Sequence, residues 1–225
     1  MGGKLIVIES GSDASGKATQ TKMLFDRLFK ENYKVKKVEF PNYKSDSSAL
    51  VKMYLNGDLG EKPEDINPYA ISTFYAADRF ASYKMQWEDF YQDGGVILAD
   101  RYTTSNMVYQ AAKFKNKAKK DKFLDWLWEL EFSLYELPQP DVVFFLDIPP
   151  TFTKKLMKER EEINGKGQIK DIHEENLQYL DQSYNNALYI ADKYNWEKIN
   201  CIKNNELMTK DEIHELIYEK SKYYF

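Results

Sequence analysis

A chain of 225 residues with 43% hydrophobic residues is long enough to form one α/β domain with a sizeable core. Its 30% charged residues and its net charge of -4 argue against broad binding to nucleic acid or to a membrane surface. The single cysteine, Cys201, excludes an internal disulfide and is interpreted as a small apolar residue of a late strand. The start of the chain shows no signal-type apolar run, so we expect a cytoplasmic protein.

Short apolar runs alternate along the chain with longer segments of helical periodicity. Strands are predicted at 4–9, 35–40, 95–99, 141–147 and 197–202. Helices are predicted near 16–32, 45–56, 67–92, 104–113, 121–136, 151–162, 173–195 and 209–222. This alternation predicts one domain built on a five-stranded parallel sheet with helices on both faces. Because such sheets bind ligands at the carboxyl ends of their strands, polar motifs directly after a strand are the candidates for a site.

The segment after the first strand has the pattern of a phosphate-binding loop. It has the spacing G-x-x-x-x-G-K and reads Gly11-Ser12-Asp13-Ala14-Ser15-Gly16-Lys17-Ala18-Thr19. Glycines let backbone N–H groups surround an anion, and the following helix adds its positive end. Lys17 supplies a cation for the β- and γ-phosphates of a nucleotide. The alternative is a structural glycine turn, and the strand before and helix after favour phosphate binding.

The residue after the lysine is Ala18, at a position where a Ser or Thr hydroxyl usually ligates Mg²⁺. Thr19 offers a hydroxyl one position later, about 100° further around the helix. A carboxylate that holds a metal-bound water is the other route, and the candidates are Glu9 and Asp100, each at the end of a predicted strand.

Asp100 and Arg101 stand together directly after the third predicted strand. An acid beside an arginine at a strand end suits a site that holds both a metal and a phosphate. The alternative is an exposed ion pair without a function.

Two sets of helical side chains suit the binding of a nucleotide base. Tyr75 and Arg79 are four residues apart and share a helix face, where a ring can stack on a base and a guanidinium can bind a phosphate. Ser105 and Tyr109 are also four apart, and the amide of Gln110 suits the edge of a pyrimidine. Taken alone, a core tyrosine and a surface arginine would be the ordinary interpretation.

The polar segment 158–172 contains two glycines and four basic residues, among them Arg160. Such a segment suits a lid that closes over a triphosphate, and a solvated loop is the alternative. The basic run 113–122 is interpreted as a solvated connection. Neither His173 nor His214 has a partner at metal-ligand spacing, so no zinc site is predicted.

Taken together, the chain resembles the thymidylate kinases, P-loop nucleoside monophosphate kinases that phosphorylate dTMP. The resemblance covers nearly the whole chain, in the order GSDASGKATQ, FPNY at 40–43, YAADR at 75–79, DRYTTSNMVYQ at 100–110, LPQPDVVFFLDIPP, and DIHE at 171–174. It implies a P-loop NTPase-type three-layer sandwich with a short lid, and ATP and Mg²⁺ as cofactors. It also implies nucleotides as partners, no nucleic acid or membrane partner, and a homodimer.

The resemblance also implies roles for single residues. ATP binds the loop 11–19, and the catalytic set is Lys17, Asp13, Asp100, Arg101 and Arg160. By the resemblance, Asp13 is expected near the sugar 3′-hydroxyl and Asp100 near the metal, to which the hydroxyl of Thr19 adds the second candidate ligand. The residues implied to bind the acceptor dTMP are Asp13, Phe40, Tyr75, Arg79, Arg101, Ser105, Tyr109 and Gln110. Within this set, Arg79 and Arg101 are assigned to the acceptor phosphate.

Several positions depart from the family pattern. Ala14 stands where some members carry a catalytic arginine, so Arg160 in the lid is the candidate for that role. Tyr43 replaces an arginine of eukaryote-type members, and one extra residue, Ser10 or Glu9, lies before the loop. The alternatives are a kinase for another deoxynucleotide or a deoxynucleoside, or a nucleotide-binding protein with weak catalysis. The two acceptor-side arginines favour a monophosphate.

Overall fold

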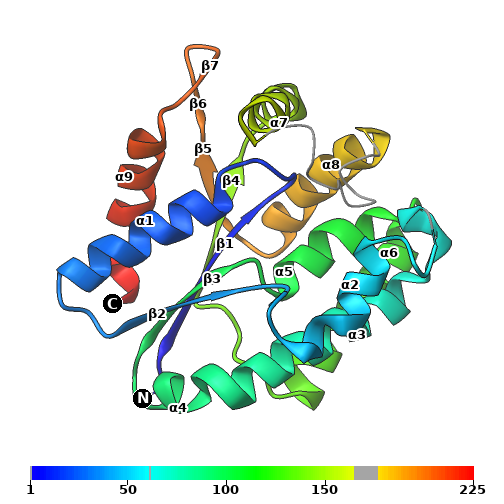
Figure 1. Ribbon diagram of the computed structural model, residues 1–225, viewed down its shortest axis with the longest axis horizontal. Helices are drawn as coiled ribbons and strands as arrows, with labels where there is room; N and C mark the ends of the chain where they lie inside the picture. Colours follow the sequence, from blue (N-terminus) through cyan, green and yellow to red (C-terminus); the bar gives the residue numbers. More distant parts are fainter. Residues whose placement is uncertain (1, 61, 165–176) are drawn as a thin grey trace.

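The sheet has five parallel strands in the order β2-β3-β1-β4-β5 (Figure 1). The computed structural model describes residues 2–60, 62–164 and 177–225, with the backbone alone at 160–164, 177 and 178. The strands are β1 (Lys4–Ser10), β2 (Val35–Glu39), β3 (Val96–Asp100), β4 (Val142–Asp147) and β5 (Glu197–Asn200). The predicted fold class is confirmed, because all five strands form where the apolar runs stand.

Alternate residues of the central strand face two separate cores. Ile6 and Ile8 pack with apolar residues of α1 (Lys17–Lys30) and α9 (Lys210–Ser221) on one face of the sheet. Leu5 and Val7 pack on the other face against the remaining large cluster, which includes Trp87, Phe123 and Ile190. β1 is buried on both faces and lies between β3 and β4 in the sheet. The phosphate loop starts at the carboxyl end of β1, the edge at which such sheets bind ligands.

The remaining helices complete the layers on the second face and the rim. They are α2 (Ala49–Leu55), α3 (Pro68–Ser82), α4 (Glu88–Gln92), α5 (Thr103–Ser105), α6 (Lys117–Trp128), α7 (Pro150–Asn164) and α8 (Leu177–Lys193). Single 3₁₀ turns lie at Asp46–Ser48, Pro63–Asp65 and Lys222–Tyr224. Helix α6 begins earlier than predicted because the side chain of Asn116 caps it, accepting a hydrogen bond from the Lys119 N–H.

Three of the predicted helices contain a π-helical turn that the sequence periodicity did not reveal. The turns are Tyr83–Trp87 between α3 and α4, Asn106–Gln110 after α5, and Glu129–Leu134 after α6. A π turn holds one more residue than an α turn and is frequent at functional sites. It therefore changes which side chains share a helix face.

The fifth predicted strand ends earlier than expected. β5 stops at Asn200, and a short antiparallel hairpin follows, formed by β6 (Ile202–Lys203) and β7 (Glu206–Leu207). Asn204 and Asn205 both have positive φ angles, as a two-residue hairpin turn requires. Cys201 lies buried between the two elements, and burial raises the pKa of its thiol to about 12, so the residue packs as an apolar side chain.

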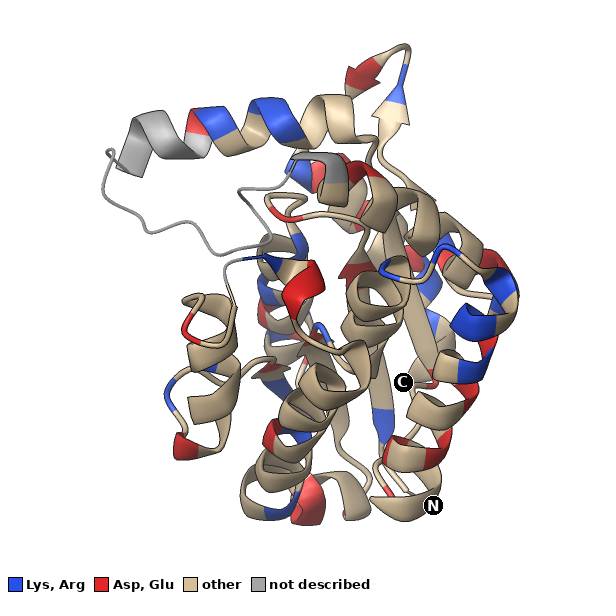
Figure 2. Cartoon of the chain, turned by 90° about the vertical axis from the view of Figure 1, so that its right-hand side faces the viewer, with Lys and Arg blue, Asp and Glu red and all other residues tan. Residues whose placement is uncertain are grey.

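The outer surface mixes both charge signs. Figure 2 shows Lys and Arg interspersed with Asp and Glu on the outer helices of this view. Within the described ranges, no helix combines the length and the apolar character that crossing a membrane requires.

Candidate active site

A hollow of about 580 Å³ lies over the predicted phosphate loop. Residues 13–19 line it together with Asp100, Arg101, Leu156 and Glu159. The first two loop residues, Gly11 and Ser12, are buried beneath this surface. The structure therefore brings the predicted ATP-binding loop and the two residues after β3 to one cavity at the carboxyl ends of the strands.

The two glycines of the loop are required for different reasons. Gly16 has a φ of +84°, which disfavours any side chain, although a Cβ there would meet no neighbouring atom within 4 Å. A Cβ on Gly11 would lie 2.8 Å from the Cα of Tyr184 in α8. The first glycine thus lets the loop backbone pack directly against α8, and the second allows the turn into α1.

The ammonium group of Lys17 is buried among oxygens of its own loop. Its Nζ donates to the Ser10 hydroxyl at 2.7 Å, to the Ser12 carbonyl at 2.9 Å and to the Ser15 hydroxyl at 3.3 Å. Burial lowers the pKa of Lys17 to about 8, and the positive charge of Arg101 acts in the same direction. Ser10, the last residue of β1, thus serves as a direct partner of the lysine.

Asp13 and Arg101 form an ion pair between the phosphate loop and the end of β3. The Nζ of Lys17 lies 4.0 Å from the same Asp13 carboxylate. Burial opposes the charge of Arg101, but Asp13 outweighs it and the pKa of Arg101 is raised well above its usual value. Arg101 has a φ of +66°, a conformation that is uncommon for a non-glycine residue and typical of functional sites.

The residues that could hold Mg²⁺ fit a metal that arrives with phosphates. Asp100 and Thr19 both line the hollow and supply one carboxylate and one hydroxyl. Burial raises the pKa of Asp100, while Arg101 and Lys17 oppose this shift. Mg²⁺ is commonly held by one or two carboxylates, phosphate oxygens and water. In the part of the chain that the structure describes, no group of three or more His, Cys, Asp or Glu forms a metal site on its own.

Glu9, the other candidate for a metal-bound water, does not line the donor hollow. Its side chain is fully buried, and its carboxylate accepts hydrogen bonds from the Ser10 N–H at 2.9 Å, Thr104 at 2.8 Å and Ser105 at 2.5 Å. Glu9 therefore ties the end of β1 to the helix that follows β3.

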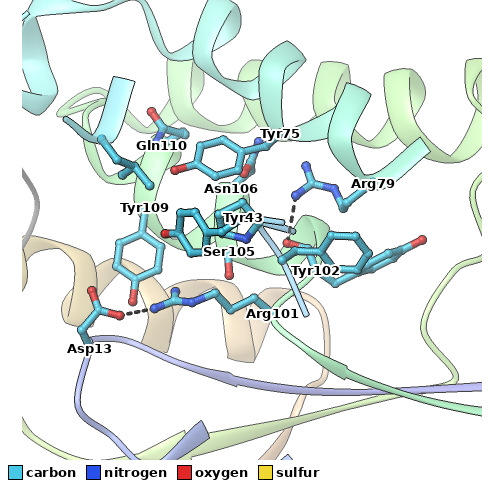
Figure 3. Close-up of a pocket in the computed structure, with 13 residues that line it drawn as sticks. Asp13, Tyr43, Tyr75, Arg79, Arg101, Tyr102, Ser105, Asn106, Tyr109 and Gln110 are labelled. Carbon is cyan, nitrogen blue, oxygen red and sulfur yellow. Dashed lines mark hydrogen bonds and ion pairs between the residues drawn. The ribbon is translucent and has the colours of Figure 1, made fainter. Parts of the chain in front are cut away.

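A second pocket adjoins the hollow and contains every residue predicted to bind the acceptor (Figure 3). Those residues are Asp13, Phe40, Tyr75, Arg79, Arg101, Ser105, Tyr109 and Gln110. Pro41, Tyr43, Leu55, Tyr102 and Asn106 complete the lining. Asp13 and Arg101 line both cavities, so the two cavities meet at this ion pair.

The polar groups of the pocket lie on opposite sides. Figure 3 shows the Asp13–Arg101 pair along one side, with Tyr75 and Gln110 on the other. The guanidinium of Arg101 lies 5.4 Å from the centre of the Tyr109 ring. The buried Oε1 of Gln110 has no hydrogen-bond partner among the described residues, so it is available to a ligand.

Three contacts in the pocket were missed by the sequence analysis. Arg79 is buried and forms a two-bond ion pair with Glu131, a residue outside every quoted motif. Asn106 joins the pocket lining from within the π turn Asn106–Gln110. Ser105, expected on the base side, lines the pocket but donates its hydroxyl to Glu9. The apolar run LWELEF contains two acids, Glu129 and Glu131, and such acids inside an apolar run were the signal that could have pointed to a buried ion pair.

Most of the predicted lid, 158–172, lies outside the residues that the structure describes. Residues 158–164 belong to α7, while 165–172, together with His173 and the rest of DIHE, lie outside the described residues, as does the side chain of Arg160. His214 is buried in α9, and burial lowers its pKa, which agrees with a packing role.

A phosphate loop with a buried lysine, joined through shared charged residues to a pocket of aromatic and amide groups, defines a P-loop kinase of small phosphorylated acceptors. The thymidylate kinase family model matches residues 8–213. The chain belongs to the thymidylate kinase family, and it is an enzyme.

Individual relatives agree with this assignment. The chain is 29% identical over 182 residues to the thymidylate kinase of Schizosaccharomyces pombe, covering 81% of this chain and 79% of the relative. It is 29% identical over 184 residues to that of Plasmodium falciparum, covering 81% and 80%. The solved structure of thymidylate kinase from Candida albicans matches with a TM-score of 0.69 at 23% identity, covering 99% of this chain and 92% of the other, and supports the fold.

Proposed function

We propose that this enzyme transfers the γ-phosphate of ATP to dTMP, giving ADP and dTDP. Family membership supports ATP as the donor and dTMP as the acceptor. The observation that carries the proposal is the junction of the two cavities at Asp13 and Arg101. A phosphoryl group that passes from one cavity to the other travels beside these two residues.

The chemistry requires positioning and charge neutralisation more than a general base. The acceptor atom is a phosphate oxygen that is already anionic, so the protein must hold two polyanions in line. Lys17 and the N–H groups of loop 11–19 would bind the donor phosphates, for which the lysine exchanges its loop oxygens for phosphate oxygens. Arg101 would bind the acceptor phosphate near the transferred group.

Magnesium would bind between the donor phosphates and the protein. Asp100 and Thr19 are the residues that would hold it, directly or through water, and it would neutralise charge on the β- and γ-phosphates. Arg160 in α7 is the proposed source of a further positive charge over the transferred group. The aromatic rings of Tyr75 and Phe40, with Gln110, would bind the base side of dTMP.

Arg79 is also proposed to bind the acceptor, but its ion pair with Glu131 limits the charge that it can offer. Its charge is balanced inside the protein by Glu131, at contacts of 2.7 and 2.5 Å. Arg79 therefore offers hydrogen-bond donors with little net charge. Comparing the affinities of an Arg79→Gln variant for dTMP and for thymidine tests its assignment to the phosphate, because only dTMP affinity should fall if that assignment holds.

A coupled assay of ADP release tests the function and separates it from its alternatives. We expect turnover with dTMP at a kcat/KM well above that for thymidine, dUMP and dCMP. Faster turnover with thymidine would favour a deoxynucleoside kinase, and faster turnover with another monophosphate would change the acceptor. Saturable ATP binding with no turnover on any acceptor would support a binding protein.

We also propose a homodimer formed through the α3 side of the molecule. Phe80, Met85 and Leu134 are large apolar residues that are exposed there, and the ring of Phe80 packs 5.3 Å from that of Tyr135. The contact between Phe80 and Tyr135 joins α3 to the turn after α6, and exposed apolar side chains of this kind suit a subunit contact. Light scattering on the wild type and on a Met85→Glu variant tests this, since the dimer should weaken in the variant. A cytoplasmic location stays a prediction, testable by cell fractionation.

A further inference from the structure

Glu131 is a fully buried carboxylate beside the acceptor pocket and is not part of the pocket lining. It is 0% exposed and lies in the π turn Glu129–Leu134. Its Oε2 accepts from Arg79 Nε at 2.7 Å and its Oε1 from Arg79 Nη2 at 2.5 Å. The Thr103 hydroxyl donates to Oε2 at 2.6 Å. Glu131 therefore binds side chains from α3 and α5, two elements that form the pocket.

The two-bond contact fixes which edge of the Arg79 guanidinium faces the pocket. A guanidinium has five N–H donors in one plane, and Glu131 takes the Nε and Nη2 edge. Nη1 donates to the Tyr102 carbonyl at 3.4 Å. Two N–H groups, on Nη1 and Nη2, have no acceptor among the described residues. Figure 3 shows the guanidinium end of Arg79 in the pocket, so a ligand can accept from them.

We propose that Glu131 is a positioning residue for the acceptor: its carboxylate locks Arg79 in the orientation that presents these two donors to the acceptor nucleotide. The inference rests on the proposed function, because it assumes that the acceptor occupies this pocket. Glu131 acts through Arg79 and does not itself line the pocket. Its hydrogen-bond partners among the described residues are Arg79 and Thr103, and neither belongs to the phosphate loop, so its effect is confined to the acceptor side.

The substitution Glu131→Gln separates the charge and geometry of this carboxylate from its volume. An amide offers one acceptor oxygen and places an NH₂ group against an N–H of Arg79, so the two-bond contact is lost. Glu131→Asp keeps the charge and shortens the reach by one methylene. The matched control is Glu129→Gln, which makes the same change at an exposed residue of the same turn.

The measurements are kcat, the KM for dTMP, the KM for ATP, and the thermal midpoint of each variant. For Glu131→Gln we expect the KM for dTMP to rise about tenfold or more, as misplacement of a binding group does, with the KM for ATP within about twofold of the wild type. The KM for dTMP of Glu131→Asp should lie between those of the wild type and Glu131→Gln, and Glu129→Gln should have the KM values of the wild type. A folded Gln variant with the wild-type KM for dTMP would overturn the proposal.

A purely structural role gives a different result. It would lower the thermal midpoint and leave both KM values unchanged, or it would raise both together. If the Gln variant does not fold, the ratio of the two KM values in the Asp variant decides by the same criterion. If wild-type enzyme is inactive with dTMP but active with another acceptor, the proposed acceptor is wrong, and the ratio measured with the true acceptor still tests Glu131.

Discussion

The Lys17 ammonium group donates a hydrogen bond of 2.7 Å to the hydroxyl of Ser10, which stands directly before the phosphate loop. Ser10 also accepts from the Ser15 hydroxyl at 2.6 Å and donates to the Ser12 carbonyl at 2.7 Å. The serine hydroxyls and the carbonyl thus form a small polar network that holds the cation against the loop. Nucleotide phosphates must compete with this network for the lysine.

Replacing Lys17 by alanine should lower kcat by about 10³-fold or more, because the γ-phosphate loses its main protein cation. The measurement is ADP release at saturating ATP and dTMP. Lys22→Ala is the matched control, since Lys22 is an exposed lysine of the same helix that pairs with Asp26. Wild-type turnover in the Lys17→Ala variant would contradict the assignment of the phosphate loop.

The depressed pKa of Lys17 predicts a pH limit on ATP capture. The pKa lies at about 8, so the free enzyme loses this charge above that pH, and kcat/KM for ATP should fall about tenfold per pH unit there. kcat should decline at higher pH, because bound phosphates favour the charged lysine. Initial rates between about pH 6.5 and 10 measure both, and a constant kcat/KM up to about pH 9.5 would exclude this role.

The same shift predicts how stability depends on pH. Between about 8 and the ordinary value of 10.5, the unfolded chain holds a proton on Lys17 that the folded protein has released. The unfolded state binds more protons in this window, so the contribution of Lys17 to the free energy of unfolding rises with pH. The stability of the wild type relative to Lys17→Met should therefore improve between these two pH values in urea titrations.

Arg101→Ala should reduce kcat/KM for dTMP by about 10³-fold or more, as loss of an arginine contact to a transferring phosphoryl group does. Among the described cations that line these cavities, Arg101 alone lines both, since Lys17 lines only the donor hollow and Arg79 only the acceptor pocket. Arg27→Ala serves as the control, because Arg27 pairs with Glu31 and Glu215 at a distance from the site. An active Arg101→Ala enzyme would move the phosphate-binding role to another residue.

Restoring a hydroxyl at position 18 should reduce the Mg²⁺ concentration needed for half-maximal rate. Ala18 lines the donor hollow beside Thr19, so a serine there adds an oxygen ligand where P-loop enzymes usually have one. Asp100→Asn should act in the opposite direction by removing the carboxylate. Magnesium titrations of activity at fixed ATP measure the half-maximal concentration in both variants. An unchanged value in both would show that neither position 18 nor Asp100 contributes to metal binding.

The two glycines of the loop predict unequal costs. Gly11→Ala should destabilise the protein by several kcal/mol, because its Cβ would press on the backbone of Tyr184 at 2.8 Å. Gly16→Ala should cost about 1–2 kcal/mol, since only the left-handed backbone opposes it. Thermal unfolding of the two variants measures which loses more stability. A greater loss of stability in Gly16→Ala would contradict the close packing of Gly11 against Tyr184 as the larger constraint.

Local patterns predicted the strands and the phosphate loop, because each of these depends on neighbours in sequence. The set of acceptor residues came from the resemblance to the thymidylate kinases, and all of its members line one pocket. Glu131 escaped prediction because its partner Arg79 is 52 residues away, and only packing of the turn after α6 against α3 brings them together. Asn106 escaped because a π turn widens the helix face that an α-helical period assigns to Ser105 and Tyr109. Glu9 lies at the predicted strand end, but the sequence did not reveal that its carboxylate accepts hydrogen bonds from the hydroxyls of Thr104 and Ser105.

Because Asp13 and Arg101 line both cavities, the two substrates are energetically linked. A phosphate in either cavity competes with Asp13 for the Arg101 guanidinium and so changes the charge that the other cavity presents. By thermodynamic reciprocity, the factor by which ATP changes the affinity for dTMP equals the factor by which dTMP changes the affinity for ATP. We therefore expect this ion pair to make ternary-complex formation cooperative, with the sign of the coupling set by which substrate releases Arg101 from Asp13.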